Sequence, residues 1–78
     1  MSKELIDYFD FSKAEPYWHK FEGDFLHDKR HGYGILYFQD GSKFTGRFHE
    51  GKVHGKGTFY LKNGDVVNSK WEKNIMLL

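Results

Sequence analysis

The sequence of 78 residues contains no cysteine, a single proline and no long hydrophobic run. The absence of cysteine excludes disulfides, thiol nucleophiles and cysteine-ligated zinc or iron–sulfur centres. The apolar run at the C-terminal end, Ile75 to Leu78, is far shorter than a membrane span, and the acidic stretch Met1 to Asp10 does not fit a secretory signal. We therefore expect a soluble, intracellular and cytoplasmic protein.

The chain also has no excess of charge of one sign. Lys and Arg number 12 and Asp and Glu number 11, which gives a net charge of +1. Proteins that bind nucleic acid by neutralising phosphates carry a clear basic surplus, so nucleic acid is not an expected partner. A chain of this length buries only about 60% of its unfolded surface, which predicts one small domain or part of a larger one.

Aromatic residues and glycine are abundant instead. Aromatics make up 19% of the chain, and there are nine glycines. Disordered chains are rich in glycine but poor in aromatics. The two together indicate β structure with tight turns and rings packed against bare backbone.

An internal repeat organises the chain. Residues 21–43 and 44–66 carry phenylalanine, histidine and glycine at equivalent positions, and a third, truncated copy begins at Val67. The segment before Phe21 shares none of these glycines. The sequence therefore divides into a non-repeat leader (1–20), two repeats (21–43 and 44–66) and a truncated third repeat with a hydrophobic tail (67–78).

Each repeat has the pattern of a β-hairpin. The first strand of each copy alternates apolar and polar residues, and the return strand is rich in aromatic and β-branched residues. The predicted strands are Phe21–Phe25, Gly32–Phe38, Phe44–Phe48, Gly55–Leu61 and a last strand that ends near Trp71. We predict a mostly β fold: a single elongated antiparallel sheet of about five strands, with a short irregular or helical leader.

Asp40-Gly41 and Asn63-Gly64 predict type I′ hairpin turns, because such turns require positive φ at both central residues. A two-residue turn at Asp40-Gly41 sets Ile35 opposite Gly46. A five-residue turn sets Gly34 opposite Phe48 instead. We favour the second register, because it puts each bare glycine on the same face as a ring that covers it.

The motifs Phe-x-Gly-x-Phe and Gly-x-x-His-Gly-x-Gly, followed by a turn that ends in glycine, resemble the MORN (membrane occupation and recognition nexus) repeat. The copy from Phe44 to Gly57 is close to the family pattern, whereas Asp28 and Ser69 depart from it. The resemblance implies successive hairpins in one twisted sheet. It also implies scaffold roles in cytoskeletal, ciliary (axonemal) or membrane-associated assemblies, and self-association in some members.

One face of the predicted sheet carries most of the rings, and a single layer cannot bury its own face. We predict that this face binds a protein partner, either an amphipathic helix or a neighbouring subunit. The predicted partner-binding residues are Phe21, Phe25, Phe38, Phe44, Phe48, Leu61 and Trp71.

Two segments of the chain itself are alternative covers for this face. In the leader, Leu5, Ile6 and Phe9 have the spacing of one helical face, and Ser12–Glu15 resembles a capping box. Pro16 prevents a long helix there. The hydrophobic tail 75–78 would fray in water unless it docks on the sheet or on another molecule.

No pattern indicates an enzyme, a cofactor or a small-molecule substrate. The carboxylates form no recurring pair, no Gly-x-Ser-x-Gly elbow is present, and the glycines lack the third glycine and helix of a phosphate loop. His31 and His54 recur at the same repeat position, so we expect their rings to bond the backbone and shape the loops. The alternative is a zinc site from His27, Asp28 and His31, or from His49, Glu50 and His54.

The second hypothesis for function is a peripheral membrane module. Lys29, Arg30 and Lys52 lie in the predicted connections and would bind anionic phospholipid. Stable attachment to anionic membranes usually requires about four to eight clustered basic residues, and carboxylates interrupt this set. We therefore favour the protein partner.

Overall fold

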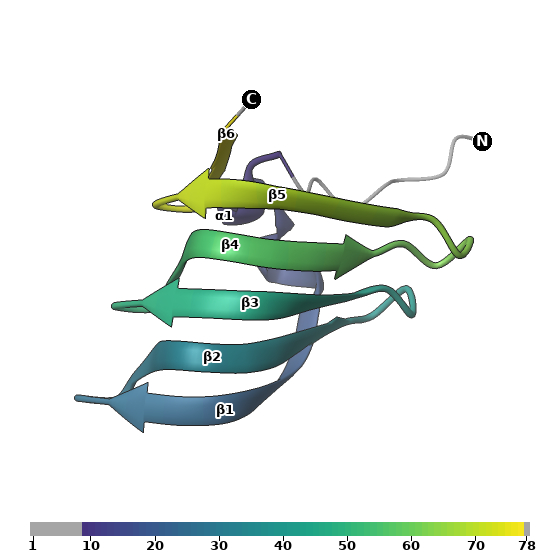
Figure 1. The fold of residues 1–78 in the computed structure, drawn as a ribbon. Helices are drawn as coiled ribbons and strands as arrows, with labels where there is room; N and C mark the ends of the chain where they lie inside the picture. Colours follow the sequence, from purple (N-terminus) through teal and green to yellow (C-terminus); the bar gives the residue numbers. More distant parts are fainter. Residues whose placement is uncertain (1–8, 78) are drawn as a thin grey trace.

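A computed structural model of the chain describes residues 9–77 (Figure 1). Its six strands form one open antiparallel sheet in which each strand pairs with the next along the chain. The elements are α1 (Phe11–Ala14), the 3₁₀ helix η1 (Glu15–Tyr17), β1 (Trp18–Leu26), β2 (Lys29–Phe38), β3 (Lys43–His49), β4 (Lys52–Tyr60), β5 (Val66–Glu72) and β6 (Ile75–Leu77). The predicted mostly β, single antiparallel sheet is confirmed.

The sixth strand is the hydrophobic tail. Trp71 of β5 pairs with Met76 of β6, and on the other side Ile75 forms an isolated bridge with Asp10 of the leader. The N–H of Met76 donates to the carbonyl of Phe9 at 2.8 Å. The tail therefore docks on the sheet and brings the two ends of the described chain together.

The hairpin turns differ from the predicted ones. Both central residues have positive φ at His27-Asp28, Glu50-Gly51 and Lys73-Asn74. This is the pattern of the type I′ turn, so the tight turns lie in the connections between the predicted hairpins. At Asp40-Gly41 and Asn63-Gly64 only the glycine has positive φ, and the prediction of type I′ turns there is wrong.

Side-chain hydrogen bonds explain this difference. Asp40 Oδ1 accepts a hydrogen bond from the N–H of Ser42 at 2.9 Å, and Asn63 makes the equivalent bond to Asp65. Such bonds hold the first turn residue in an ordinary conformation and leave the positive φ to glycine. Phe38 N–H then donates to the Ser42 carbonyl at 3.0 Å, which closes a three-residue loop.

The three-residue loop gives the β2–β3 hairpin neither predicted register. Gly34 lies opposite Gly46, and Leu36 lies opposite Phe44. Both predicted registers are wrong, and the favoured one is wrong by two residues. Because side chains alternate with a period of two, a shift of two residues leaves the faces unchanged. The prediction that Gly34 and Leu36 share a face with Phe44 is therefore confirmed.

Two of the rings, Phe21 and Phe44, each cover two glycines on neighbouring strands. A Cβ built at Gly46 would lie 2.5 Å from Phe44 Cζ, and one at Gly57 would also collide with this ring. Phe21 covers the equivalent pair of glycines in the first repeat, Gly23 and Gly34. These positions require glycine because a ring lies directly on the backbone.

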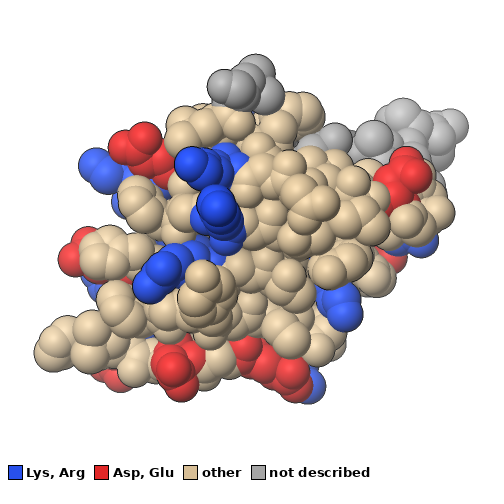
Figure 2. Space-filling model, in the orientation of Figure 1, with Lys and Arg blue, Asp and Glu red and all other residues tan. Residues whose placement is uncertain are grey.

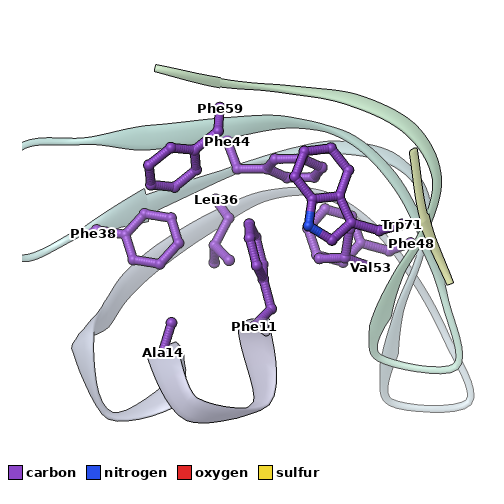
Figure 3. Close-up of a cluster of buried hydrophobic side chains, with 9 residues drawn as sticks. All are labelled: Phe11, Ala14, Leu36, Phe38, Phe44, Phe48, Val53, Phe59 and Trp71. Carbon is purple, nitrogen blue, oxygen red and sulfur yellow. The ribbon is translucent and has the colours of Figure 1, made fainter. Parts of the chain in front are cut away.

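The leader covers the aromatic face of the sheet (Figure 3). Phe11 points from α1 into the rings, and its centroid lies 5.0 Å from that of Phe44 and 5.7 Å from that of Trp71, both in edge-to-face geometry. Ala14, one turn later, is also buried. The buried core consists of Phe11, Ala14, Leu36, Phe38, Phe44, Phe48, Val53, Phe59 and Trp71.

The N-cap of α1 is Asp10, whose side chain accepts a hydrogen bond from the N–H of Ser12 at 3.0 Å. Ser12 therefore lies within the helix, and the predicted capping box from Ser12 to Glu15 is wrong. The chain continues into η1, where Pro16 is the second residue, because proline is tolerated in a first helical turn. Leu5 and Ile6 lie outside the described residues.

Asn74 holds the leader, the tail and β4 together. Its Oδ1 accepts from the N–H of Val53 at 2.8 Å, and its carbonyl accepts from the N–H of Phe11 at 2.8 Å. Its Nδ2 lies 3.4 Å from Ser12 Oγ, to which it donates. The side chain is buried, so these bonds replace water for several backbone groups at once.

Candidate partner-binding surfaces

Four of the seven residues predicted to bind a partner are buried. Phe38, Phe44, Phe48 and Trp71 are at most 3% exposed. They pack beneath α1, so in this structure they form part of the protein's own core. The predicted cover from the leader did not include Phe11 and Ala14, although their spacing of three residues places both on one helical face.

The row of rings ends on an exposed residue. Phe25 is 59% exposed, whereas Phe48 and Trp71, at the same position of the later repeats, are each 1% exposed. The half-buried Phe21 links Phe25 to the core, with ring centroids 5.4 Å from Phe25 and 5.0 Å from Phe48. Leu61 is also half-buried and packs against the core.

The outer edge of β1 is open within residues 9–77, where β1 pairs with β2 alone. Leu26 is 49% exposed, and because neighbouring side chains point to opposite faces, Phe25 and Leu26 present apolar surface on both sides of this edge. Lys20 and Glu22 form an exposed ion pair of 3.1 Å on the same strand. Such charges limit indiscriminate pairing at a sheet edge.

The Lys20 ammonium, through its hydrogen bond and its charge, lowers the pKa of the Glu22 carboxyl, and the Tyr37 hydroxyl contributes a further hydrogen bond. The carboxylate therefore stays ionised to a lower pH than an isolated glutamate. The β1 edge thus carries a fixed pair of opposite charges beside its exposed rings.

The three residues of the lipid hypothesis lie at one end of the sheet, but they are not equivalent. Lys29 and Lys52 are exposed. The Arg30 guanidinium stacks over the Trp18 ring at 4.4 Å, and its Nη2 donates to the carbonyl of Gly51 at 3.3 Å. Burial lowers the pKa of Arg30, an effect that Glu15 partly opposes. Arg30 thus binds within the protein, and of the three residues of the lipid hypothesis only Lys29 and Lys52 are exposed.

Three histidines lie side by side on neighbouring strands. The ring centroids of His31 and His49 are 5.4 Å apart, and those of His49 and His54 are 6.0 Å apart. His54 Nδ1 accepts from the N–H of Lys73 at 3.4 Å, so this ring bonds the backbone as predicted. Within the described residues, no group of three or more histidine or carboxylate side chains has the arrangement of a metal site.

A groove of about 1010 Å³ lies on the sheet face opposite α1. Its floor is the row of paired residues Gly34, Gly46, Gly57 and Ser69, which crosses β2 to β5. This surface was not predicted from the sequence. The signal was present in part, since Arg47 and Lys70 occupy the same repeat position, but Asp24 in the first copy breaks the pattern.

The comparisons with known proteins agree with this geometry. The family model for the MORN repeat matches residues 21–43 and 44–66, the same two repeats that the internal periodicity of the sequence defines. Together these matches cover more than half of the chain. A search among curated proteins gave no significant match. No helix in the described part of the chain is both long and apolar enough to cross a lipid bilayer.

Proposed function

Because the chain belongs to the MORN repeat family, we propose that it is a non-catalytic scaffold or structural subunit that binds a neighbouring subunit at the β1 edge. MORN repeats are known for scaffolding roles in association with proteins or membranes, and family membership gives this chain a function of that general kind. In its simplest form, the neighbouring subunit is a second copy of the same chain.

The exposure of Phe25 is the observation that carries this proposal. The equivalent rings in the second and third repeats pack against a phenylalanine of the repeat before them: Phe48 lies 5.0 Å from Phe21, and Trp71 lies 5.1 Å from Phe44. Phe25 has no preceding repeat within residues 9–77 to cover it. A strand added at the β1 edge would cover the Phe25 ring on one face of the sheet and Leu26 on the other face.

A two-fold partner also fits the charges of this edge. In an antiparallel pair of β1 strands centred on Glu22, all of Trp18–Leu26 is paired, and Lys20 of each copy lies opposite Asp24 of the other. The two Glu22 carboxylates then meet at the centre, each beside the Lys20 of its own copy. Opposite charges in directly facing positions stabilise a strand pair, and a two-fold contact satisfies both pairs at once.

The buried residues of the predicted surface enter this proposal only if the leader moves. Phe38, Phe44, Phe48 and Trp71 contact a partner helix when α1 leaves the sheet, whereas Phe21 and Leu61 are partly accessible with α1 in place. The setting that we propose, a cytoskeletal, ciliary or membrane-associated assembly in the cytoplasm, is supported by family membership alone.

Native mass across a concentration series tests this proposal. We expect a dimer whose dissociation constant rises at least tenfold in Phe25→Ser. Tyr33→Ser is the matched control, because Tyr33 is 67% exposed and lies on β2, away from the β1 edge. A chain that stays monomeric at every concentration, or an equal effect of both substitutions, would contradict a second copy at β1.

A further inference from the structure

The sheet face opposite α1 carries three exposed cations that have no ionic partner among residues 9–77. Arg47, Lys56 and Lys70 lie on β3, β4 and β5 and are all exposed. None of them forms an ion pair with another residue in the range 9–77. Figure 2 shows Lys and Arg gathered in a column across the central strands of this face, with Asp and Glu confined to its periphery.

Two of these cations face each other directly. Lys56 and Lys70 are paired residues of β4 and β5. Like charges in directly opposite positions destabilise a strand pair. An anion bound between the two ammonium groups would turn this repulsion into attraction, so the position favours a negatively charged ligand.

Arg47 extends the positive charge to the next strand. Its guanidinium lies 5.0 Å from the centroid of the Tyr33 ring. Its aliphatic part lies beside Gly55 of β4, where a Cβ would be in ordinary contact, at 3.5 Å, with Arg47 Cβ and Cδ. The aromatic contact holds the cation over the sheet without neutralising it.

The groove beside these cations has two different walls. One wall includes Lys56, Lys70 and Leu77. The other is the paired row Ile35, Thr45, Thr58 and Asn68. Thr58 Oγ1 donates to Asn68 Oδ1 at 2.7 Å, which leaves the amide N–H groups of Asn68 as donors for a ligand.

The groove has the size of a short extended segment. It crosses four strands, which are about 4.8 Å apart, and this gives a length of roughly 15 Å. An extended peptide rises about 3.3 Å per residue, so four or five residues fill this length. The hydroxyl and amide groups of one wall suit a peptide backbone, whereas the other wall suits carboxylates.

We infer that this groove binds an extended, acidic segment of a partner protein, with its carboxylates between Lys56 and Lys70. The surface is separate from the β1 edge, so this inference stands or falls independently of self-association. A membrane of anionic lipid is the competing ligand, but a flat bilayer would not use the neutral wall of the groove.

Fluorescence anisotropy with a labelled hexaglutamate peptide tests the inference on the whole chain. The measurement belongs at low ionic strength, about 20 mM, where exposed charges are weakly screened. We expect saturable binding that weakens at least tenfold in Lys56→Gln/Lys70→Gln. The matched control is Lys29→Gln/Lys52→Gln, which removes the same charge from the exposed first residues of β2 and β4 and should change the affinity less than twofold.

A neutral substitution separates the groove from its charge. Thr45→Trp fills the groove without altering any cation, and we expect it to weaken hexaglutamate binding at least fivefold. Thermal melting checks that each variant is folded, and amide shift changes in the wild type, gathered on the two walls of the groove, give a readout that needs no variant.

Several results would overturn the inference. Equal loss in the two lysine variants would mean attraction to net charge alone, and unchanged binding in a folded Thr45→Trp would mean that the groove is not used. Binding to phosphatidylcholine vesicles containing phosphatidylserine, without binding to hexaglutamate, would assign the face to a membrane. Failure of the peptide to bind while Phe25→Ser still weakens self-association would leave only the β1 proposal.

Discussion

Truncation of Phe11 to alanine tests whether the leader stabilises the sheet. The Phe11 ring is fully buried and makes edge-to-face contacts with four rings at centroid distances between 5.0 and 5.9 Å. Replacing a buried phenylalanine by alanine costs about 3–5 kcal/mol. A domain of this length has a free energy of unfolding of about 4–12 kcal/mol. We therefore expect Phe11→Ala to remove about a quarter or more of the stability, or to unfold the chain.

Urea denaturation, followed by tryptophan fluorescence, measures this loss. Phe25→Ala is the control, because it makes the same substitution in an exposed ring of the same sheet. We expect this control to cost less than about 1 kcal/mol in the monomer. If Phe11→Ala cost no more than Phe25→Ala, the leader would not be docked on the sheet, and the aromatic face would be open to a partner in solution.

Three further substitutions test other contacts. Gly57→Ala should lower the melting temperature, with a cost of about 1–3 kcal/mol, because the new methyl group meets a phenyl ring; unchanged melting would contradict the observed packing. Asn74→Ala and Asn74→Gly both leave the buried Val53 N–H without its hydrogen-bond acceptor, which should lower the free energy of unfolding by about 1–3 kcal/mol. Asn74→Ala should destabilise more, because glycine adopts the positive φ of 77° without strain and alanine does not. Equal urea midpoints of the two variants would show that the backbone conformation carries no cost. Lys20→Met should raise the Glu22 pKa, measured by NMR titration of the carboxyl, because Lys20 is the main cause of its lowering. A carboxyl group whose pKa is lowered in the folded state stabilises the protein at pH values above its unfolded pKa, and this stabilisation is lost as the pH falls through the folded pKa. In Lys20→Met this pH-dependent part of the stability should be smaller.

The sheet faces could be predicted from the sequence because they depend only on alternation. The internal repeat, together with Phe44-x-Gly46-x-Phe48, assigns rings and glycines to one face in any register of the same parity. The register itself could not be predicted, because it depends on the loop. The hydrogen bond from Ser42 N–H to Asp40 Oδ1 selects a three-residue loop over the tighter and the wider alternative.

The candidate surfaces were predicted less well than the fold. The rings that the repeat pattern identifies are the most apolar residues, and for that reason the leader buries most of them. Phe25 stays exposed because it belongs to the first repeat. The three cations Arg47, Lys56 and Lys70 were not predicted as a group, because Lys56 occupies a different repeat position from the other two. Only the strand pairing of Lys56 with Lys70 places it beside them.

The attachment of the leader depends on a departure from the repeat. Asp28, Gly51 and Asn74 occupy the same turn position in the three copies, and all have positive φ. Asparagine tolerates this conformation better than most residues, and it also has a side chain that can bond. In the third copy the Asn74 side chain accepts a hydrogen bond from the N–H of Val53, and the backbone carbonyl of Asn74 accepts one from the N–H of Phe11. The turn position that joins two strands in the first repeats thus also fixes the leader in the last one.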